Sequence, residues 1–517
     1  MKYYIANRWT VKKASTVPVK ESRSRSSLSA GEKRTADRFF PVFRARILCY
    51  DRGEIPSLTG GNRLRSIFGI IGPVMVGPSS SHTAGMARIG AEAFRRLPPD
   101  PREIALRFSR KMQATYRGHR SDCAVIGGAL GLAPDSPELK NARRIAEEKN
   151  VSVSVAFFEE GEVPQNTVRV TFRYSDGVSR SLTASSVGGG SIEILALDGQ
   201  AVSLSPFCDY GESLPGVPAP PTLGEALAAC REGVSLSEQA LRYEEKRSGK
   251  GRETIVSDMA LRLQVMKDSV KAGQGKNDPL FGLTPGDEGA KLLRRVRAGS
   301  SVSGGRISLA TAYALGVMEH NASMGRVVAA PTAGSAGILP GVLLATAEEE
   351  SVTDGRLVQA LFTAGLLGVI MDRKGVSFSG SVGGCQGEIG VSSALAAAAL
   401  TSLYTEDGEA VAHAMAMSLK NLLGLVCDPI GGPVEVPCIK RNSVGVANAF
   451  ICADMALSGI RSFIPPEEVL DALIDVQKRM PSELRCAAVG GLACTETACR
   501  WRENESKSAD KKENSSC

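Results

Sequence analysis

The spacing of apolar residues changes once along this chain of 517 residues, near residue 222. Before that point, short stretches alternate apolar and polar residues with the period of two that is typical of strands. After it almost nothing alternates, and apolar residues recur at helical spacing. The chain therefore predicts an α+β N-terminal domain followed by an all-α C-terminal domain.

Composition and pattern together divide the chain into four predicted parts. Residues 1–62 are polar, rich in Ser and Arg and without a sustained period, which predicts a disordered basic extension. Residues 63–221 form the α+β domain, which ends in the proline-rich sequence GVPAPPT. Residues 222–500 form the all-α domain, and residues 501–517 form a charged, flexible tail.

The apolar periods also predict individual elements. In the first domain we expect helices at 83–96 and 122–132, strands at 104–108, 151–158 and 192–196, and a hairpin that joins 166–174 to 179–184 through an SDG turn. In the second domain we expect helices at 223–245, 254–270, 287–298, 308–320, 339–347, 356–370, 391–404, 410–423 and 443–457.

The net charge of +7 belongs to the extension. The first 60 residues carry 13 Lys and Arg against 5 Asp and Glu, so the remainder has a net charge of about −1. Aromatic residues make up only 5% of the chain, which leaves few stacking platforms for bases. We therefore expect no nucleic-acid partner.

The chain has twelve cysteines, which form disulfides in an oxidising compartment and stay reduced in the cytoplasm. The N-terminus lacks the apolar stretch of a secretory signal, so we expect reduced thiols and a cytoplasmic location. The basic, hydroxyl-rich extension leaves organelle targeting open. Residues 327–347 are uncharged and long enough to span a bilayer, but they contain PTAGSAGILPG, which predicts a buried loop entering a helix. We expect no membrane partner.

A cluster of hydroxyl groups stands directly before the first predicted helix, in the sequence GPSSSHTAG. Its hydroxyl residues are Ser79, Ser80, Ser81 and Thr83, with His82 among them. A plain helix cap needs only one hydroxyl. Free N–H groups at a helix N-terminus favour an anion, so the cluster predicts a site for a substrate carboxylate.

Histidine is scarce, with four residues in the whole chain. His82 and His119 both stand in glycine-flanked loops of the first domain, the latter in TYRGHRSD, which makes them candidates for general acid/base catalysis. His413 lies among alanines in a predicted helix and is expected only to pack. His320 opens HNASMGRVV and is left open as a pocket residue.

Three cysteines stand in Gly- and Pro-rich loops of the second domain. Cys385 lies in GSVGGCQGEIG, Cys427 in GLVCDPIGGPVEVP and Cys438 in VPCIKRN. Their spacing matches no zinc finger or ferredoxin motif, so spacing alone is a weak signal of a metal site. The loop context favours metal ligands, whereas cysteines inside helices are typically small buried hydrophobes.

Taken together, these motifs resemble the iron–sulfur-dependent L-serine dehydratases. Besides those quoted, SVGGGSI, EHNASMGRVVAAPTAGSAGILPG and GGLACTETAC follow in the family's order, so the resemblance spans about residues 64–499. It implies a fused β–α arrangement and a 4Fe-4S cluster held by Cys385, Cys427 and Cys438, with no pyridoxal phosphate. Cys499 is a possible fourth ligand, and Cys494 and Cys517 are weaker alternatives.

The resemblance implies the conversion of L-serine to pyruvate and ammonia, used in serine catabolism and gluconeogenesis. The hydroxyl loop would bind the serine carboxylate, the open iron would act as Lewis acid on the hydroxyl, and His82 or His119 would remove the α-proton. A homodimer is expected. Two alternatives stay open: a desulfidase acting on L-cysteine, which the SSSHTAG loop disfavours, and a non-catalytic iron or redox sensor.

Overall fold

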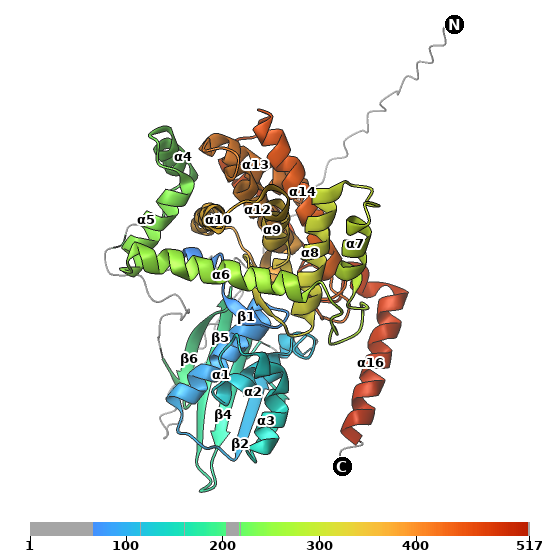
Figure 1. Ribbon diagram of the computed structural model, residues 1–517. Coiled ribbons are helices and arrows are strands. Elements are labelled where there is room, and N and C mark those ends of the chain that lie inside the picture. Colours follow the sequence, from blue (N-terminus) through green and yellow to red (C-terminus); the bar gives the residue numbers. More distant parts are fainter. Residues whose placement is uncertain (1–65, 114, 160, 203–216, 218, 515–517) are drawn as a thin grey trace, which may run out of the picture. The chain divides into compact units, whose positions relative to one another are not determined.

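The structure, a computed structural model, describes residues 66–113, 115–159, 161–202, 217 and 219–514. Helices and strands carry the labels of Figure 1. A region that combines a sheet with helices precedes a helical region, which confirms the predicted fold class. The extension that the sequence predicts to be disordered, residues 1–62, lies outside the described residues, and the domain boundaries stay predictions.

The first region contains one six-stranded sheet with the order β3-β2-β4-β5-β6-β7. Its strands are β2 (Glu103–Phe108), β3 (Ser152–Phe157), β4 (Thr167–Arg173), β5 (Ser179–Gly188), β6 (Ser191–Leu197) and β7 (Gln200–Ala201). The β2–β3 pair is parallel and the other pairs are antiparallel. Strands β4 and β5 form the predicted hairpin.

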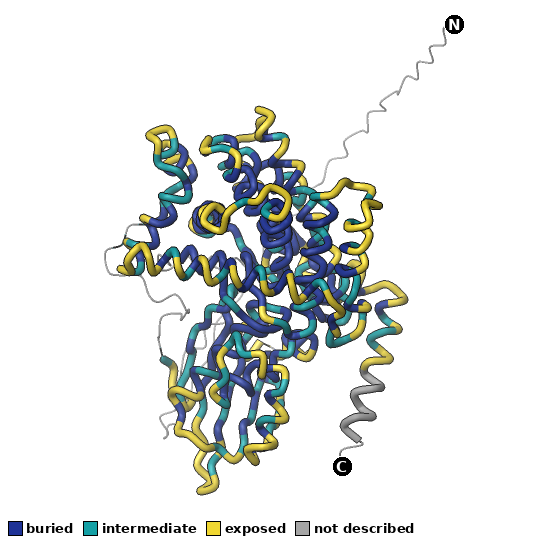
Figure 2. Tube along the Cα trace, viewed as in Figure 1, coloured by how far each residue is buried: buried dark blue, intermediate teal, exposed yellow. Residues whose placement is uncertain are grey.

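Helices cover one face of this sheet and bury its apolar side chains (Figures 1 and 2). They are α1 (Gly85–Arg96), α2 (Ser121–Ala129) and α3 (Ala142–Glu148). Gly90 and Gly128 let α1 and α2 touch through their backbones: a Cβ on Gly90 would lie 2.1 Å from the Val125 carbonyl oxygen. This close contact sets the spacing of the two helices, which follow the hydroxyl cluster and His119 in the sequence.

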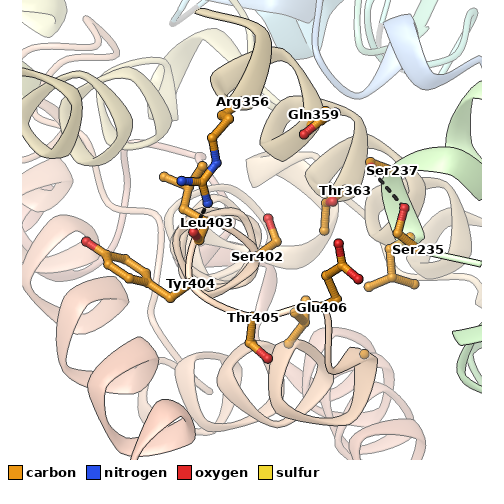
Figure 3. A pocket seen from close by; sticks show the side chains of 13 residues that line it. Ser235, Ser237, Arg356, Gln359, Thr363, Ser402, Leu403, Tyr404, Thr405 and Glu406 are labelled. Atoms are coloured by element: carbon orange, nitrogen blue, oxygen red, sulfur yellow. Dashed lines mark hydrogen bonds between the residues drawn. The ribbon is translucent and has the colours of Figure 1, made fainter. Parts of the chain in front are cut away.

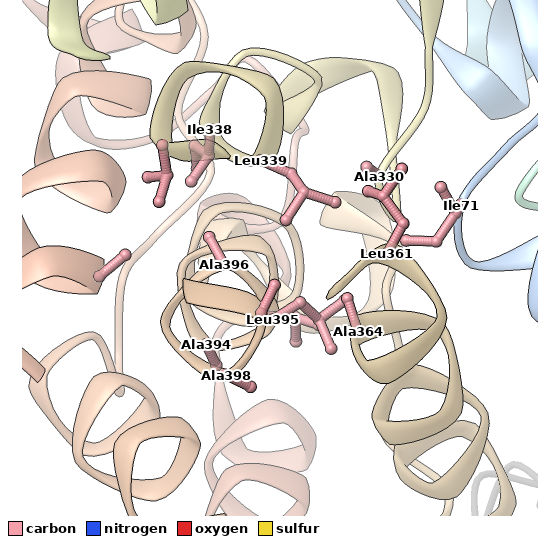
Figure 4. Close-up of a cluster of buried hydrophobic side chains, with 14 of the residues drawn as sticks. Ile71, Ala330, Ile338, Leu339, Leu361, Ala364, Ala394, Leu395, Ala396 and Ala398 are labelled. Atoms are coloured by element: carbon pink, nitrogen blue, oxygen red, sulfur yellow. The ribbon is translucent and has the colours of Figure 1, made fainter. Parts of the chain in front are cut away.

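The second region is built from helices. They are α4 (Leu223–Arg231), α5 (Leu236–Ser248), α6 (Arg252–Ala272), α7 (Glu288–Arg297), α8 (Gly305–Ala322), α9 (Ile338–Glu350), α10 (Asp354–Lys374), α11 (Gly380–Gly383), α12 (Val391–Ser402), α13 (Gly408–Asn421), α14 (Cys438–Leu457), α15 (Pro466–Arg479) and α16 (Glu496–Asn514). Every residue of α12 from Val391 to Thr401 is buried. This helix packs against α9, α10, α13 and α14, and Figure 4 shows its Leu395 next to Ala364 of α10.

The sequence prediction differs from the structure in a few elements. A single helix at 223–245 is wrong, because Gly233 adopts a left-handed conformation (φ 87°) and Ser235 caps a new helix, α5. The helices α3, α11, α15 and α16 and the short strands β1, β7 and β8 were not predicted. Helix α16 extends through residues 501–514, and the flexibility of this tail stays a prediction.

Helix α10 is long and apolar enough to cross a membrane, which is true of no other helix among the described residues. Of its most apolar stretch, 78% is buried within the protein, as is typical of a core helix.

Several contacts tie the sheet region to the helices, among them a strand pair and a buried carboxylate. Strand β1 (Val74–Val76) pairs antiparallel with β8 (Arg326–Val328), a short strand within the otherwise helical region. The second contact is made by Glu244 of α5, whose carboxylate accepts the Ser66 hydroxyl (2.9 Å) and the Ile67 N–H (3.0 Å). Arg247 binds the same carboxylate at 2.7 Å, and both side chains are at most 2% exposed.

Replacing Glu244 with Gln should lower the free energy of unfolding by about 3 kcal/mol, because the buried Arg247 guanidinium would lose the charge of this carboxylate. Urea denaturation measures the change. Glu245→Gln is the matched control, since its partly exposed carboxylate lies 3.8 Å from Arg252 and its loss should cost less than about 1 kcal/mol. Equal shifts in the two variants would contradict a structural role for the buried pair.

Candidate active site

The hydroxyl cluster forms a short π-helical turn, Ser80–Ala84, that leads into α1. Ser79 caps this turn: its hydroxyl accepts the N–H of His82 at 3.1 Å, and its own N–H donates to the Thr83 hydroxyl at 3.2 Å. Gly77 precedes it with φ 98°, and a Cβ there would lie 2.5 Å from Thr83 Cγ2. The turn therefore requires glycine at position 77 and holds its hydroxyl groups in fixed positions.

Reciprocal hydrogen bonds join this turn to the loop that carries His119. The Thr83 hydroxyl donates to the His119 carbonyl oxygen, and the Ser121 hydroxyl donates to the His82 carbonyl oxygen, both at 2.7 Å. As a result the two imidazole rings stack, with centroids 4.5 Å apart and planes inclined by 15°. The structure thus brings together the two histidines that the sequence singled out.

Both imidazoles are buried and favour the neutral form. Burial lowers the pKa of His82 to about 4, against a smaller opposing effect of a hydrogen bond with Asn166. Burial, followed by the proximity of His82, lowers the pKa of His119 well below its ordinary value. Because a carbonyl oxygen only accepts, His119 Nδ1 must donate to the Thr115 carbonyl at 3.1 Å. Its Nε2 then carries a lone pair.

The three loop cysteines approach from the helical region. Cys385 precedes a second π-helical turn, Gln386–Gly390, Cys427 lies between α13 and α14, and Cys438 begins α14. Their exposed fractions are 3%, 2% and 9%. The sulfur atoms of Cys385 and Cys427 and a carboxylate oxygen of Glu388 all lie within 4.8 Å of one another. Residues that are 42 positions apart in the sequence therefore meet in space.

A fourth cysteine, Cys486, lies beside these three and was missed by the sequence analysis. Its N–H donates to the Cys427 carbonyl oxygen at 2.7 Å, and its thiol shares a hydrogen bond with the Cys427 thiol. Cys499 lies farther along, on α16, where its sulfur contacts Arg502 at 3.2 Å. The only sequence signal for Cys486 is its place in the irregular loop sequence PSELRCAAVGG.

Glu388 is the other residue that the sequence analysis missed. Desolvation raises the pKa of its carboxyl group to about 7, against a smaller lowering by a hydrogen bond with Thr332. A Cβ on Gly380 would lie 2.6 Å from this carboxylate and 3.3 Å from the Cys427 sulfur. The glycine therefore keeps open the space between the acid and the thiol.

A single cavity of about 40 Å³ collects these groups from both regions. It is lined by Pro78, Ser79, Ser81, His82, His119, Gly334, Ser379, Gly380, Ser381, Glu388, Cys427, Pro429, Val434, Cys438 and Cys486. The predicted residues Ser80, Thr83, Cys385 and Cys499 are outside this lining. His320 and His413 are outside it too, and His413 accepts the Ser462 N–H at 3.1 Å.

The donor set of this cavity fits a sulfur-ligated metal group. Hydrogen bonding with Cys385 and Cys486, followed by burial, raises the pKa of Cys427 well above its ordinary value, and burial does the same for Cys438. Buried thiols of this kind ionise readily only when a cation neutralises the sulfur charge. Arg441 supplies one cationic neighbour, 3.7 Å from the Cys385 sulfur and paired with Asp428 at 2.7 Å. Soft sulfur donors favour iron–sulfur clusters over hard cations.

Known proteins resemble both regions. A family model described as serine dehydratase beta chain matches residues 66–180, and one described as serine dehydratase alpha chain matches residues 231–493. The probable L-serine dehydratase alpha chain of Bacillus subtilis is 44% identical over 274 residues, which cover 53% of this chain and 90% of that relative. L-serine dehydratase 2 of Escherichia coli is 30% identical over 467 residues, 84% of this chain and 99% of that protein.

Proposed function

The chain belongs to the serine dehydratase family, with its alpha-chain and beta-chain parts on one polypeptide, and from this premise we propose that it is an L-serine ammonia-lyase. The reaction removes the α-proton and the β-hydroxyl of L-serine as water, which leaves aminoacrylate. Aminoacrylate tautomerises to the imine, and water then releases ammonia and leaves pyruvate. The atoms balance without an oxidant or a second substrate.

The hydroxyl turn is the proposed seat of the substrate carboxylate. Ser79 and Ser81 both line the cavity, and the turn that they begin opens α1. Hydroxyl donors and a helix N-terminus stabilise a carboxylate, and together they orient the α-carbon within the cavity. Thr83 acts indirectly, because its hydroxyl is committed to the His119 carbonyl.

His119 is the proposed base. Its ring lines the cavity, its Nδ1–H is held by the Thr115 carbonyl, and its Nε2 makes no hydrogen bond among the residues that the structure describes. His82 has less freedom, because its Nδ1 lies 3.4 Å and 3.5 Å from the hydroxyls of Ser79 and Ser81. We therefore assign proton removal to His119 and the positioning of the hydroxyl turn to His82.

Cys385, Cys427 and Cys438 are the proposed ligands of a 4Fe-4S cluster, whose open iron would supply Lewis acidity toward the leaving hydroxyl. Glu388 lies beside Cys385 and Cys427 and lines the cavity. Its raised pKa leaves part of the carboxyl group protonated near pH 7, so it can hydrogen-bond to a departing hydroxyl as a donor.

One observation carries this proposal: a single cavity is lined by hydroxyl groups of the turn, by both histidines, and by Cys427, Cys438 and Cys486. The test is an assay of the full chain after anaerobic reconstitution with iron and sulfide. We expect pyruvate and ammonium in equal amounts from L-serine, with slower release of sulfide from L-cysteine. A preparation with full iron content and no turnover would overturn the proposal and favour a sensor. Faster sulfide release would favour a desulfidase.

A further inference from the structure

A second cavity, of about 340 Å³, lies within the helical region and shares no residue with the active-site cavity (Figure 3). It is bounded by the start of α5, by α10, by the end of α12 and by the start of α13. Its lining is mostly polar, and three groups in it carry the argument: a buried hydroxyl on α10, the N-terminus of α5, and a carboxylate in the loop between α12 and α13.

The buried hydroxyl belongs to Thr363. Its side chain is 3% exposed and lines the cavity, yet no described residue forms a hydrogen bond with its hydroxyl. Thr401 shows the usual arrangement, since it is also buried and its hydroxyl donates to the Ala397 carbonyl at 2.8 Å. Because no described residue occupies this hydroxyl and it borders the cavity, it is free to hydrogen-bond to a ligand there, which the Thr401 hydroxyl is not.

The second group is the N-terminus of α5, a helix of 13 residues. Ser235 caps it, and its hydroxyl accepts the Glu238 N–H at 3.2 Å and lies 3.1 Å from the Ser237 hydroxyl. The N–H groups of the first turn have no acceptor within the helix, and the helix dipole favours a negative group there. Arg356 adds positive charge to the lining, with its guanidinium held by the Leu403 carbonyl.

The third group is a carboxylate, whose negative charge is opposite to that of Arg356. Glu406 lines the cavity, and in Figure 3 it lies among Thr363, Ser235 and Thr405. It makes no ion pair within the described part of the chain, whereas nearby Asp407 pairs with Arg461 at 3.1 Å and Glu409 with Arg231 at 2.6 Å. An unpaired carboxylate repels a simple anion and attracts an ammonium group.

From this combination we propose that the cavity binds a small zwitterion, an α-amino acid. The ligand carboxylate meets the α5 N-terminus and Arg356, its ammonium group meets Glu406, and the Thr363 hydroxyl completes the contacts. The volume is ample for a molecule of this size. The site is separate from the active-site cavity, so the inference does not rest on the proposed function.

Calorimetric titration of the full chain with glycine tests the site. We expect saturable binding that Thr363→Val and Glu406→Gln each weaken about tenfold, the usual effect of removing a hydrogen bond to a charged group. Thr401→Val and Glu409→Gln are the matched controls, because neither side chain lines the cavity, and both should bind as wild type. Unchanged affinity in Thr363→Val and Glu406→Gln would overturn the proposal, as would the absence of saturable binding.

Further measurements distinguish this site from the active-site turn and from a simple anion site. Ser79→Ala would abolish glycine binding at the active-site turn. Glycine binding at the proposed cavity must therefore persist in that variant. Acetate and inorganic phosphate should bind at least about tenfold more weakly than glycine, since neither offers an ammonium group to Glu406. Equal binding of phosphate would overturn the assignment to a zwitterion. Thermal unfolding of each variant shows whether it is folded, and Glu406 is exposed, so its replacement preserves the fold.

Discussion

Replacing His119 with Asn should lower kcat for L-serine by about 10³-fold, within the range expected for loss of a general base. Asparagine keeps a polar side chain of similar reach but has no lone pair of comparable basicity. The iron content of the variant should equal that of wild type, because His119 is not among the proposed cluster ligands and forms no hydrogen bond with a cysteine among the described residues. Exchange of the serine α-proton with deuterated solvent, followed by NMR, reports proton removal directly.

His82→Asn is the matched control for this prediction. The two rings stack at 4.5 Å, so both substitutions disturb the same contact. If His82 positions the hydroxyl turn, its loss should mainly raise KM, since Ser79 and Ser81 lose their imidazole neighbour. A greater loss of α-proton exchange in His82→Asn than in His119→Asn would reverse the assignment of the base.

The pH dependence of kcat/KM follows from the burial of His119. A base acts only in its neutral form, and an ordinary histidine with a pKa of about 6.5 becomes protonated near that pH. Burial lowers the pKa of His119 well below this value, so protonation occurs only at lower pH. We therefore expect no loss of kcat/KM as the pH falls from about 8 to about 6, and protonation of Glu388, whose pKa is about 7, should raise it, whereas an exposed histidine base would lose activity across that interval.

Some parts of this site could be read from the sequence because their residue types are unusual in their surroundings. His82 and His119 are two of four histidines, and Cys385, Cys427 and Cys438 stand in loops rich in Gly and Pro. Local sequence can signal such residues, and the structure brings them to one cavity, except for Cys385, which stands just outside its lining. The stacking of the two rings could not be predicted, because it depends on contacts across 36 positions.

Other features depend on tertiary contacts that leave no local pattern. Glu388 is one of 55 acidic residues, and its raised pKa arises from desolvation beside the cysteines. Cys486 follows a charged stretch and meets Cys427 only because the chain after α15 returns to the loop before α14. The break between α4 and α5 was signalled by Gly233, but helical periodicity on both sides concealed it.

The second large effect that we expect is the loss of iron binding when one of the loop cysteines is replaced. Replacing Cys427 with Ser should reduce the iron content after anaerobic reconstitution to near zero and remove the absorbance near about 400 nm that thiolate-bound iron produces. Cys427 is the central thiol of the set, since it shares hydrogen bonds with both Cys385 and Cys486. Cys452→Ser is the control, because that buried cysteine lies in α14 away from the cavity and should keep full iron.

Cys486 and Cys499 are then distinguished by the stability of the cluster. Cys486 lines the cavity and contacts Cys427, whereas Cys499 lies on α16 beside Arg502. If Cys486 is the fourth sulfur ligand of the cluster, the Cys486→Ser variant should lose iron to a chelator several times faster than wild type. The Cys499→Ser variant should then lose iron at the wild-type rate. The reverse order would make Cys499 the fourth ligand and would require α16 to move toward the cavity. Since Asp428 accepts the Leu492 N–H at 2.9 Å and thereby holds the chain that leads to α16, we expect the first outcome.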